Sequence, residues 1–187
     1  MRIISGNFRG KKILYPKDLK TRPLKDLTKE SIFNIIYHSN KFKLDLKSSN
    51  VLDLFSGIGS FGIECLSRGA AKVYFFENYN NSLKILKQNI LKFKLENKSL
   101  IYNYSAYNLE KSNLESLVFD IIFLDPPFKD TEIQSLIYQI KKLKVADSNS
   151  ILIIHRNKKS NDKISEYLNI VAEKNYGLSK IFFCKLI

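Results

Sequence analysis

The chain has 187 residues, 44% of them hydrophobic and 12% aromatic, which is enough apolar material for one ordinary globular domain but not for two. This composition excludes a chain that is disordered throughout, and the apolar runs are too short to span a bilayer. The formal net charge is +13, from 31 basic residues against 18 acidic ones, and such an excess favours a polyanionic partner.

The first 50 residues carry much of the basic excess, with 12 basic residues against 4 acidic ones. Short extended runs at residues 2–5 and 11–15 predict a small hairpin, and the apolar spacing over residues 25–37 predicts a helix. We therefore expect residues 1–49 to form a basic extension packed on a main domain at residues 50–187. A merely solubilising surface is the alternative. The extension's candidate RNA-binding residues are Arg2, Arg9, Lys11, Lys12, Arg22 and Lys25.

From Asn50 onward, short apolar runs alternate with longer amphipathic stretches. Strands are predicted at residues 51–55, 73–76, 100–104, 119–124 and 151–154, and helices at residues 61–68, 82–95 and 131–144. This alternation predicts a mostly parallel sheet covered on both faces, because parallel neighbours need crossover connections. Two further runs at residues 170–173 and 181–186 flank a short turn and predict an antiparallel closing pair.

Several features point to an ordinary reducing compartment. Cys65 and Cys184 form no disulfide framework, and His38 and His155 are too isolated to suggest a metal site. The first residues lack the apolar core of a signal peptide. We expect a cytoplasmic monomer that binds no metal and no membrane.

A glycine pattern, Gly57-x-Gly59-x-x-Gly62, follows the first predicted strand and precedes a helix. Glycines let the backbone approach a ligand closely, and Glu77, at the end of the next strand, could accept hydrogen bonds from ribose hydroxyls. An adenosine-containing ligand is therefore expected. Asp53, inside the first strand, suits the ammonium of a methionine moiety better than a pyrophosphate. A hydrogen bond from Asp53 to local backbone amides is the structural alternative.

The fourth strand is followed directly by Asp125-Pro126-Pro127-Phe128. The two prolines turn the backbone out of the sheet and remove two donors, which leaves the Asp125 carboxylate and backbone carbonyls as acceptors. Two acceptors can hold the hydrogens of an exocyclic amine while the nucleobase stacks on Phe128. We therefore regard these four residues as the candidate catalytic group. A rigid turn with an exposed aromatic is the structural alternative.

Together, Asp53-Leu-Phe-Ser-Gly57-Ile-Gly59, Glu77 and Asp125-Pro-Pro-Phe128 resemble the signature of class I S-adenosylmethionine-dependent methyltransferases that act on exocyclic amines. The N-terminal string Arg2-Ile-Ile-Ser-Gly6-Asn-Phe-Arg9-Gly10-Lys-Lys-Ile narrows the resemblance to the RsmD family. Thr21-Arg22-Pro23 and Lys29-Glu30-Ser-Ile-Phe33-Asn34 extend it. The resemblance implies methylation of guanine N2 in bacterial 16S ribosomal RNA, free or within the small ribosomal subunit.

The resemblance also implies a seven-stranded Rossmann-like sheet with an antiparallel last strand, and roles for individual residues. Asp125 and the Pro126 carbonyl would orient the amine. The cofactor residues would be Asp53, Phe55, Gly57, Gly59, Glu77, Asn78, Ser105 and Ala106. Three positions depart from the family pattern. Tyr79 and Ser105 stand where acidic or amide residues are frequent, and His155 stands where a glutamate is usual, so a substrate-side contact is in doubt there.

Two rival functions stay open on these residues. A DNA adenine-N6 methyltransferase could use the same motif, but the chain has no separate target-recognition domain. A non-catalytic RNA-binding assembly factor could keep the fold, but it would have no need of an intact Asp125-Pro-Pro-Phe128 motif.

Overall fold

The computed structural model describes residues 1–16, 24–42, 44–115, 117–160, 162 and 164–187, which fold around one seven-stranded sheet. Its strands are β1 (Asn50–Leu54), β2 (Lys72–Phe76), β3 (Ser99–Tyr102), β4 (Ile121–Leu124), β5 (Ile151–Asn157), β6 (Leu168–Tyr176) and β7 (Ser179–Leu186). The order across the sheet is β3-β2-β1-β4-β5-β7-β6. Strands β1 to β5 run parallel, and β7 is antiparallel to β5 and β6. The expected α/β sheet with an antiparallel last strand is confirmed.

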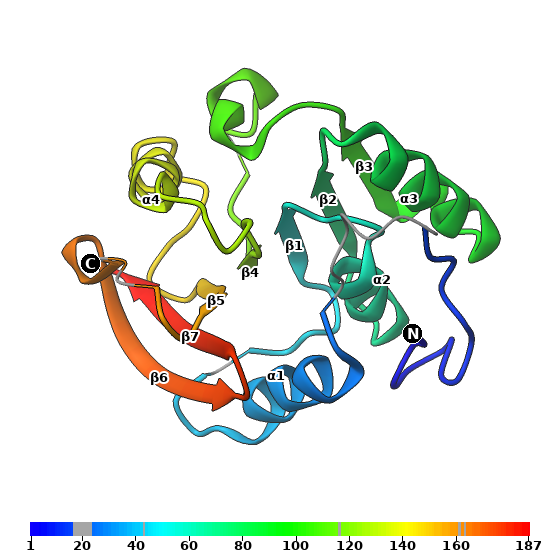
Figure 1. Cartoon of the computed structure of the whole chain (residues 1–187), viewed down its shortest axis with the longest axis horizontal. Coiled ribbons are helices and arrows are strands. Elements are labelled where there is room, and N and C mark those ends of the chain that lie inside the picture. Colours follow the sequence, from blue (N-terminus) through cyan, green and yellow to red (C-terminus); the bar gives the residue numbers. More distant parts are fainter. Residues whose placement is uncertain (17–23, 43, 116, 161, 163) are drawn as a thin grey trace.

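Helices cover both faces of this sheet (Figure 1). They are α1 (Asp26–His38), α2 (Ser60–Ser67), α3 (Asn80–Lys92) and α4 (Ile133–Lys142), with 3-10 helices η1 (Glu96–Lys98), η2 (Ala106–Ser112) and η3 (Ile164–Glu166). Successive side chains of a strand point to opposite faces, so Val51 joins the core cluster of α1, α2 and α3, whereas Leu52 joins that of η2 and α4. No helix in the described ranges is long and apolar enough to cross a membrane.

Strand β5 is longer than the sequence predicted, and its extra residues reach the predicted catalytic group. The apolar run ends at Ile154, but the strand continues through Asn157. Strand β7 makes this possible because it supplies antiparallel partners, pairing His155 with Ile181 and Asn157 with Ser179. Backbone pairing therefore extends the strand beyond the point where its apolar pattern stops.

The hairpin expected at the N-terminus is present as a narrow turn. Residues 1–16, which we call the N-terminal arm, contain an antiparallel bridge between Arg2 and Lys12. The side chains of Ile3 and Ile13 are buried in the core cluster that α1, α2 and α3 share. The arm therefore packs into the main core rather than beside it, and a domain boundary at residue 49 stays a prediction.

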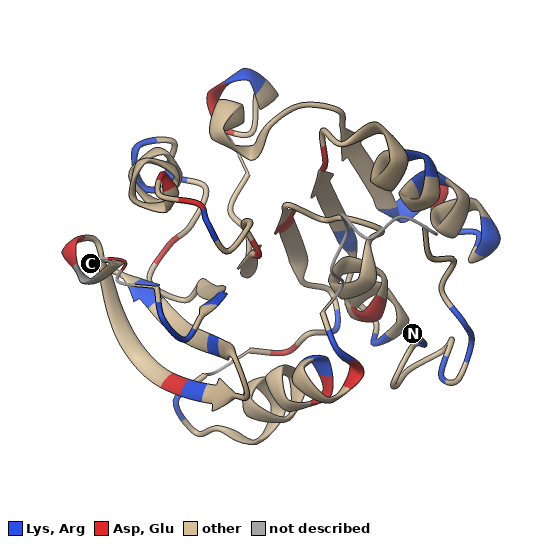
Figure 2. Cartoon of the chain, in the orientation of Figure 1, with Lys and Arg blue, Asp and Glu red and all other residues tan. Residues whose placement is uncertain are grey.

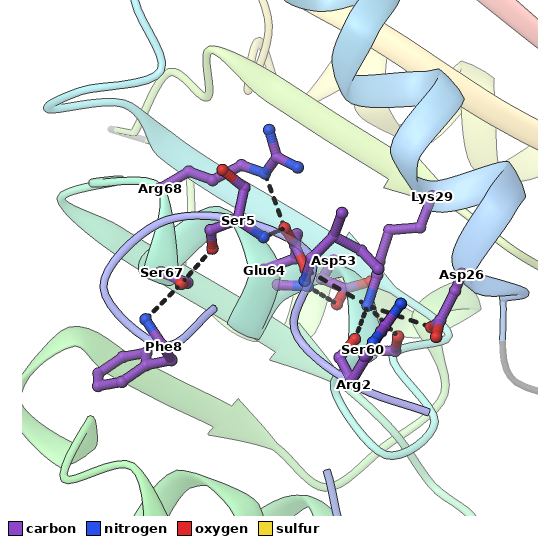
Figure 3. A network of polar contacts seen from close by, with 12 residues as sticks. Arg2, Ser5, Phe8, Asp26, Lys29, Asp53, Ser60, Glu64, Ser67 and Arg68 are labelled. Carbon is purple, nitrogen blue, oxygen red and sulfur yellow. Dashed lines mark hydrogen bonds and ion pairs between the residues drawn. The ribbon is translucent and has the colours of Figure 1, made fainter. Parts of the chain in front are cut away.

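A buried ion pair fastens the arm and α1 to α2 (Figure 3). Lys29 Nζ lies 3.4 Å from Glu64 Oε2, and both side chains are 0% exposed. The two oxygens of Glu64 also accept the backbone N–H groups of Ile4 and Ser5, at 2.8 and 2.9 Å, and Lys29 donates to the backbone oxygen of Arg2 at 2.9 Å. Burial lowers the pKa of Lys29, and the charge of Glu64 opposes that shift.

Candidate active site

Asp53, Glu77 and Asp125 lie at the carboxyl edge of the sheet, on neighbouring strands. Asp53 is within β1, Glu77 follows the last residue of β2, and Asp125 follows the last residue of β4. The register pairs the last residue of β1 with the last residues of both β2 and β4. Glu77 and Asp125 therefore leave the sheet on either side of β1, at the point where the strand order reverses. In open α/β sheets, ligands bind in the crevice at this point.

The loop after β1 turns sharply because Phe55, Gly57 and Gly59 have positive φ angles of 63°, 56° and 83°. The Ser56 hydroxyl donates to the backbone oxygen of Asp53 at 2.6 Å, which fixes the start of the turn. The positive φ of Gly59 disfavours any other residue there, and a Cβ at this position would also push against the Leu86 side chain of α3, 2.5 Å away. The glycine loop is therefore packed closely against α3.

The Glu77 carboxylate ties this glycine loop to the end of β2. Its Oε2 accepts the Gly57 N–H at 2.7 Å, and its Oε1 accepts the Tyr79 N–H at 2.7 Å. Burial raises the pKa of Glu77, and these backbone hydrogen bonds oppose the increase. Each carboxylate oxygen has a second lone pair, so Glu77 can accept further hydrogen bonds from ligand hydroxyls. Asn78, the residue between Glu77 and Tyr79, is exposed.

Asp53 lies beneath the glycine loop and is 1% exposed. Its Oδ2 accepts the Gly62 N–H at 3.0 Å, so the hydrogen bond to a local backbone amide that the sequence left open is present. Burial raises the pKa of Asp53 well above its usual value, and the charges of Asp125 and Glu77 raise it further, whereas the Gly62 N–H lowers it. The charges of Asp125 and Glu77 are therefore close enough to act on Asp53. Such a site suits a ligand with positive charge.

The loop after β4 carries the predicted catalytic group, and β5 holds it in place. Asp125 Oδ1 lies 2.7 Å from Nδ1 of His155. Pro126 is buried, Pro127 is exposed, and Phe128 is half-buried. The Phe128 ring meets the His155 ring edge-on, with 5.6 Å between centroids. The motif therefore presents a carboxylate and an aromatic ring side by side, both in contact with His155.

Arg156 holds the far side of the same loop. Its guanidinium donates to the backbone oxygens of Pro127 at 3.2 Å and Asp130 at 2.6 Å, and it pairs with both carboxylate oxygens of Asp162, at 2.6 and 2.8 Å. A cleft of about 540 Å³ opens beside the loop, with Phe128 and Arg156 in its lining. Sequence reasoning noted His155 only as a departure from the family pattern and did not name Arg156, because the apolar run predicts a strand that ends before either residue.

Ser105 and Ala106 lie where the chain enters η2, which packs against α4: Gln139 of α4 donates to the Tyr107 oxygen at 3.0 Å. The Ser105 Oγ accepts the Tyr107 N–H at 3.3 Å as the N-cap, and Ala106 is buried. The Tyr107 hydroxyl donates to Asp130 Oδ2 at 2.5 Å, and its ring meets Phe55 edge-on. Burial raises the pKa of Tyr107 above its usual range. Tyr107 therefore contacts both Phe55 of the glycine loop and Asp130, which follows the catalytic motif. No sequence motif indicated a role for Tyr107.

The predicted RNA-binding residues do not all lie in one place: Arg2 lies near the start of α2, because Lys29 donates to both the Arg2 oxygen and the Ser60 hydroxyl, whereas the tip of the arm lies further away. Arg22 lies outside the described residues. The other five are all exposed: Arg2, Arg9, Lys11, Lys12 and Lys25. The Asn7 N–H donates to the Ser67 oxygen in the last turn of α2, and Lys92 in the last turn of α3 donates to the Lys12 oxygen, both at 2.7 Å. Since these helices end where the next strand begins, the tip of the arm lies toward the edge opposite Asp125.

Figure 2 marks basic residues on the ribbon of the arm and along α3, which runs from the carboxyl edge toward that tip. The exposed lysines of this helix are Lys84, Lys87 and Lys92. A polyanion that reached both the arm and the catalytic loop would therefore follow a surface that already carries positive charge.

Three comparisons identify proteins that are similar to this chain. A family model described as "Conserved hypothetical protein 95" matches residues 1–185. A Buchnera aphidicola protein named ribosomal RNA small subunit methyltransferase D is 30% identical over 183 residues, covering 98% of this chain and 89% of its own length. The Escherichia coli protein yhhF, assigned as a methyltransferase, superposes with a TM-score of 0.81 at 23% identity, over 100% of this chain and 97% of its own.

A third similar protein, SMU.776, was solved in complex with SAH. It superposes with a TM-score of 0.66 at 15% identity, over 86% of this chain and 50% of its own. At such identities, the two solved structures establish the fold, and they confirm the Rossmann-like architecture expected from the sequence.

Proposed function

We propose that this chain, which belongs to the RsmD family, transfers a methyl group from S-adenosylmethionine to N2 of a guanine in 16S ribosomal RNA. Its curated relative acts, by its name, on the RNA of the small ribosomal subunit. The observation that carries the proposal is the gathering of Asp53, Glu77 and Asp125 around the glycine loop, next to an aromatic ring at Phe128.

The residues at the carboxyl edge fit S-adenosylmethionine, which supplies an electrophilic methyl group on a positively charged sulfur. Its charged sulfur and ammonium match an edge that carries three acidic side chains, whereas a pyrophosphate would bring further negative charge to the same edge. Glu77 accepts the ribose hydroxyls, and Asp53 stabilises the ammonium from beneath the loop. The other proposed contacts are Phe55, Gly57, Gly59 and Asn78 on the loop and strand end, and Ser105 and Ala106 beside the adenine.

Asp125 and the Pro126 carbonyl accept the hydrogens of the target amine and thereby turn its lone pair toward the methyl group. The carboxylate also stabilises the positive charge that develops on the nitrogen, and its oxygen receives the proton that the nitrogen releases. Phe128 stacks on the guanine. A base inside an RNA helix cannot reach these groups, so the guanine leaves its stack to bind.

The direct test incubates the purified protein with methyl-labelled S-adenosylmethionine and either free 16S RNA or small subunits from a strain lacking its own RsmD-family enzyme. We expect label in N2-methylguanosine, identified by mass spectrometry of the digested RNA. No transfer to either substrate would contradict the proposal. In a parallel reaction with DNA as the substrate, label in N6-methyldeoxyadenosine would instead establish the rival activity.

For the cofactor, we expect Glu77→Ala to weaken S-adenosylmethionine binding by about 1.5–3 kcal/mol, the usual loss for hydrogen bonds to a charged acceptor. Calorimetry measures the dissociation constant. Because Glu77 also holds the Gly57 N–H, Glu77→Gln is the matched control: its remaining acceptor oxygen should preserve part of the affinity. An unchanged dissociation constant in folded Glu77→Ala would remove Glu77 from the cofactor site.

For the RNA, we expect replacement of Arg9, Lys11 and Lys12 by alanine to weaken binding while leaving cofactor affinity unchanged. Each lost phosphate contact should also reduce the slope of log affinity against log salt by about 0.7–0.9. The control replaces three exposed lysines at the end of α4, Lys141, Lys142 and Lys144, and so removes the same charge away from both the arm and the catalytic loop. Equal slopes for the two triple variants would mean that the arm makes no specific RNA contact.

A further inference from the structure

A chain of hydrogen-bonding groups runs from the catalytic loop into the closing strands of the sheet. His155 Nδ1 lies 2.7 Å from Asp125 Oδ1, and His155 Nε2 lies 2.8 Å from the Ser179 Oγ. The His155 side chain is 9% exposed and that of Asp125 is 20% exposed. Both ring nitrogens of a largely buried imidazole are thus engaged, one of them by the proposed catalytic carboxylate.

The sheet places these three residues together. Leu124, the last residue of β4, pairs with Ile154 of β5, so the next residues along each strand, Asp125 and His155, are neighbours. Ser179 is the first residue of β7 and pairs with β5 at its last residue. Each partner therefore comes from a different strand, and the arrangement depends on the extension of β5 beyond its apolar run.

The chemistry of the three groups fixes their roles. An ionised carboxylate can only accept, so the imidazole nitrogen beside Asp125 must carry the hydrogen. In the neutral ring Nε2 then has a free lone pair, and the Ser179 hydroxyl donates to it. This orientation directs the His155 N–H at Oδ1 and leaves Oδ2 of Asp125 with both lone pairs free to accept from a substrate amine.

We infer that His155 is a positioning residue for methyl transfer: it holds the Asp125 carboxylate in the orientation that the target amine requires, and Ser179 holds the imidazole. This inference rests on the proposed function. Hydrolase triads also link an aspartate, a histidine and a serine in this order. Here, however, the aspartate lies at the carboxyl edge of the sheet, where we propose that the cofactor binds. His155 itself exchanges no proton with the substrate. Its effect reaches the reaction through the geometry of Asp125.

The test compares two amide variants that replace different nitrogens of the imidazole. His155→Asn places an N–H donor near the position of Nδ1, whereas His155→Gln reaches only the position of Nε2 and the Ser179 hydroxyl. We expect His155→Gln and His155→Leu to lower kcat about 10- to 100-fold, the effect of losing a hydrogen bond to a charged group. His155→Asn should retain most of the activity. The KM for S-adenosylmethionine should change less than about twofold in all three, because ground-state cofactor contacts are intact.

Ser179→Ala tests the outer end of the chain. We expect a smaller loss of kcat than in His155→Leu, and no further loss when Ser179→Ala is added to His155→Asn, since that variant no longer contacts Ser179. Ser150→Ala is the control: it removes a buried hydroxyl that donates to the Phe119 oxygen at the opposite end of β5. It should lower thermal stability without lowering kcat.

A spectroscopic measurement covers the case in which a His155 variant fails to fold. In the unmodified protein, nitrogen NMR should show the neutral His155 ring protonated on Nδ1. Equal kcat values for His155→Asn and His155→Gln, or a loss that follows thermal stability alone, would contradict the inference. An Nε2–H tautomer would do the same. Unmodified protein that transfers no methyl group would instead contradict the proposed function.

Discussion

Replacement of Asp125 by alanine is expected to abolish methyl transfer while leaving the fold and most of the cofactor affinity intact. The carboxylate holds an amine hydrogen and stabilises a positive charge that appears only as the nitrogen attacks. An interaction that is stronger in the transition state than in the ground state lowers kcat more than binding when it is lost. Loss of one such preorganised group costs about a hundred- to a thousandfold in rate.

Asp125→Asn sharpens this experiment, because its amide oxygen can still accept one hydrogen bond but supplies no negative charge. We expect its rate to lie between those of the unmodified protein and Asp125→Ala. The measurement is single-turnover transfer of labelled methyl to 16S RNA, with circular dichroism to confirm the fold. Near-normal turnover in Asp125→Ala would mean that the amine is held by other groups and that the active-site proposal is wrong.

The sequence predicted the parts of the fold that depend on local pattern. Apolar runs and glycine turns placed the parallel strands, and motif spacing brought Glu77 and Asp125 to one edge because parallel strands share that edge. Asp53 shows the limit of such reasoning. Its type and position were informative, but its hydrogen bond to Gly62 depends on how the loop closes over it.

What the sequence could not predict are contacts made by residues outside the apolar pattern. His155 and Arg156 follow an apolar run, and a residue in that position is more often structural or solvated. Only pairing with β7 continues the strand and aims both side chains at the catalytic loop. Their roles come from contacts between strands far apart in the chain, which a local pattern cannot encode.

Among the side chains that hold the N-terminal arm against α1 and α2, we expect Glu64 to be the one whose replacement lowers the free energy of unfolding most. Glu64→Ala would leave the buried Lys29 ammonium and the Arg68 guanidinium, whose Nε lies 2.8 Å from Glu64 Oε1, without their shared carboxylate. It would also remove the acceptors for the Ile4 and Ser5 N–H groups. Breaking a buried pair in this way costs about 3–5 kcal/mol, because an uncompensated charge remains in the interior. Denaturant unfolding measures the loss, and hydrogen exchange at Ile4 and Ser5 reports whether the arm has detached.

The double variant Lys29→Met with Glu64→Met distinguishes the charge from the rest of the network. Arg68 loses its carboxylate partner in Glu64→Ala and in the double variant alike, so the comparison isolates Lys29. If the unpaired Lys29 ammonium causes most of the loss, replacing Lys29 and Glu64 by apolar side chains should recover part of the stability that Glu64→Ala removes. The arm should still exchange faster, because its backbone donors have lost their acceptors. A loss below about 1 kcal/mol in Glu64→Ala would mean that water or another group already compensates Lys29. The arm would then be held by its apolar side chains, and its basic residues would keep their place on the surface without this ion pair.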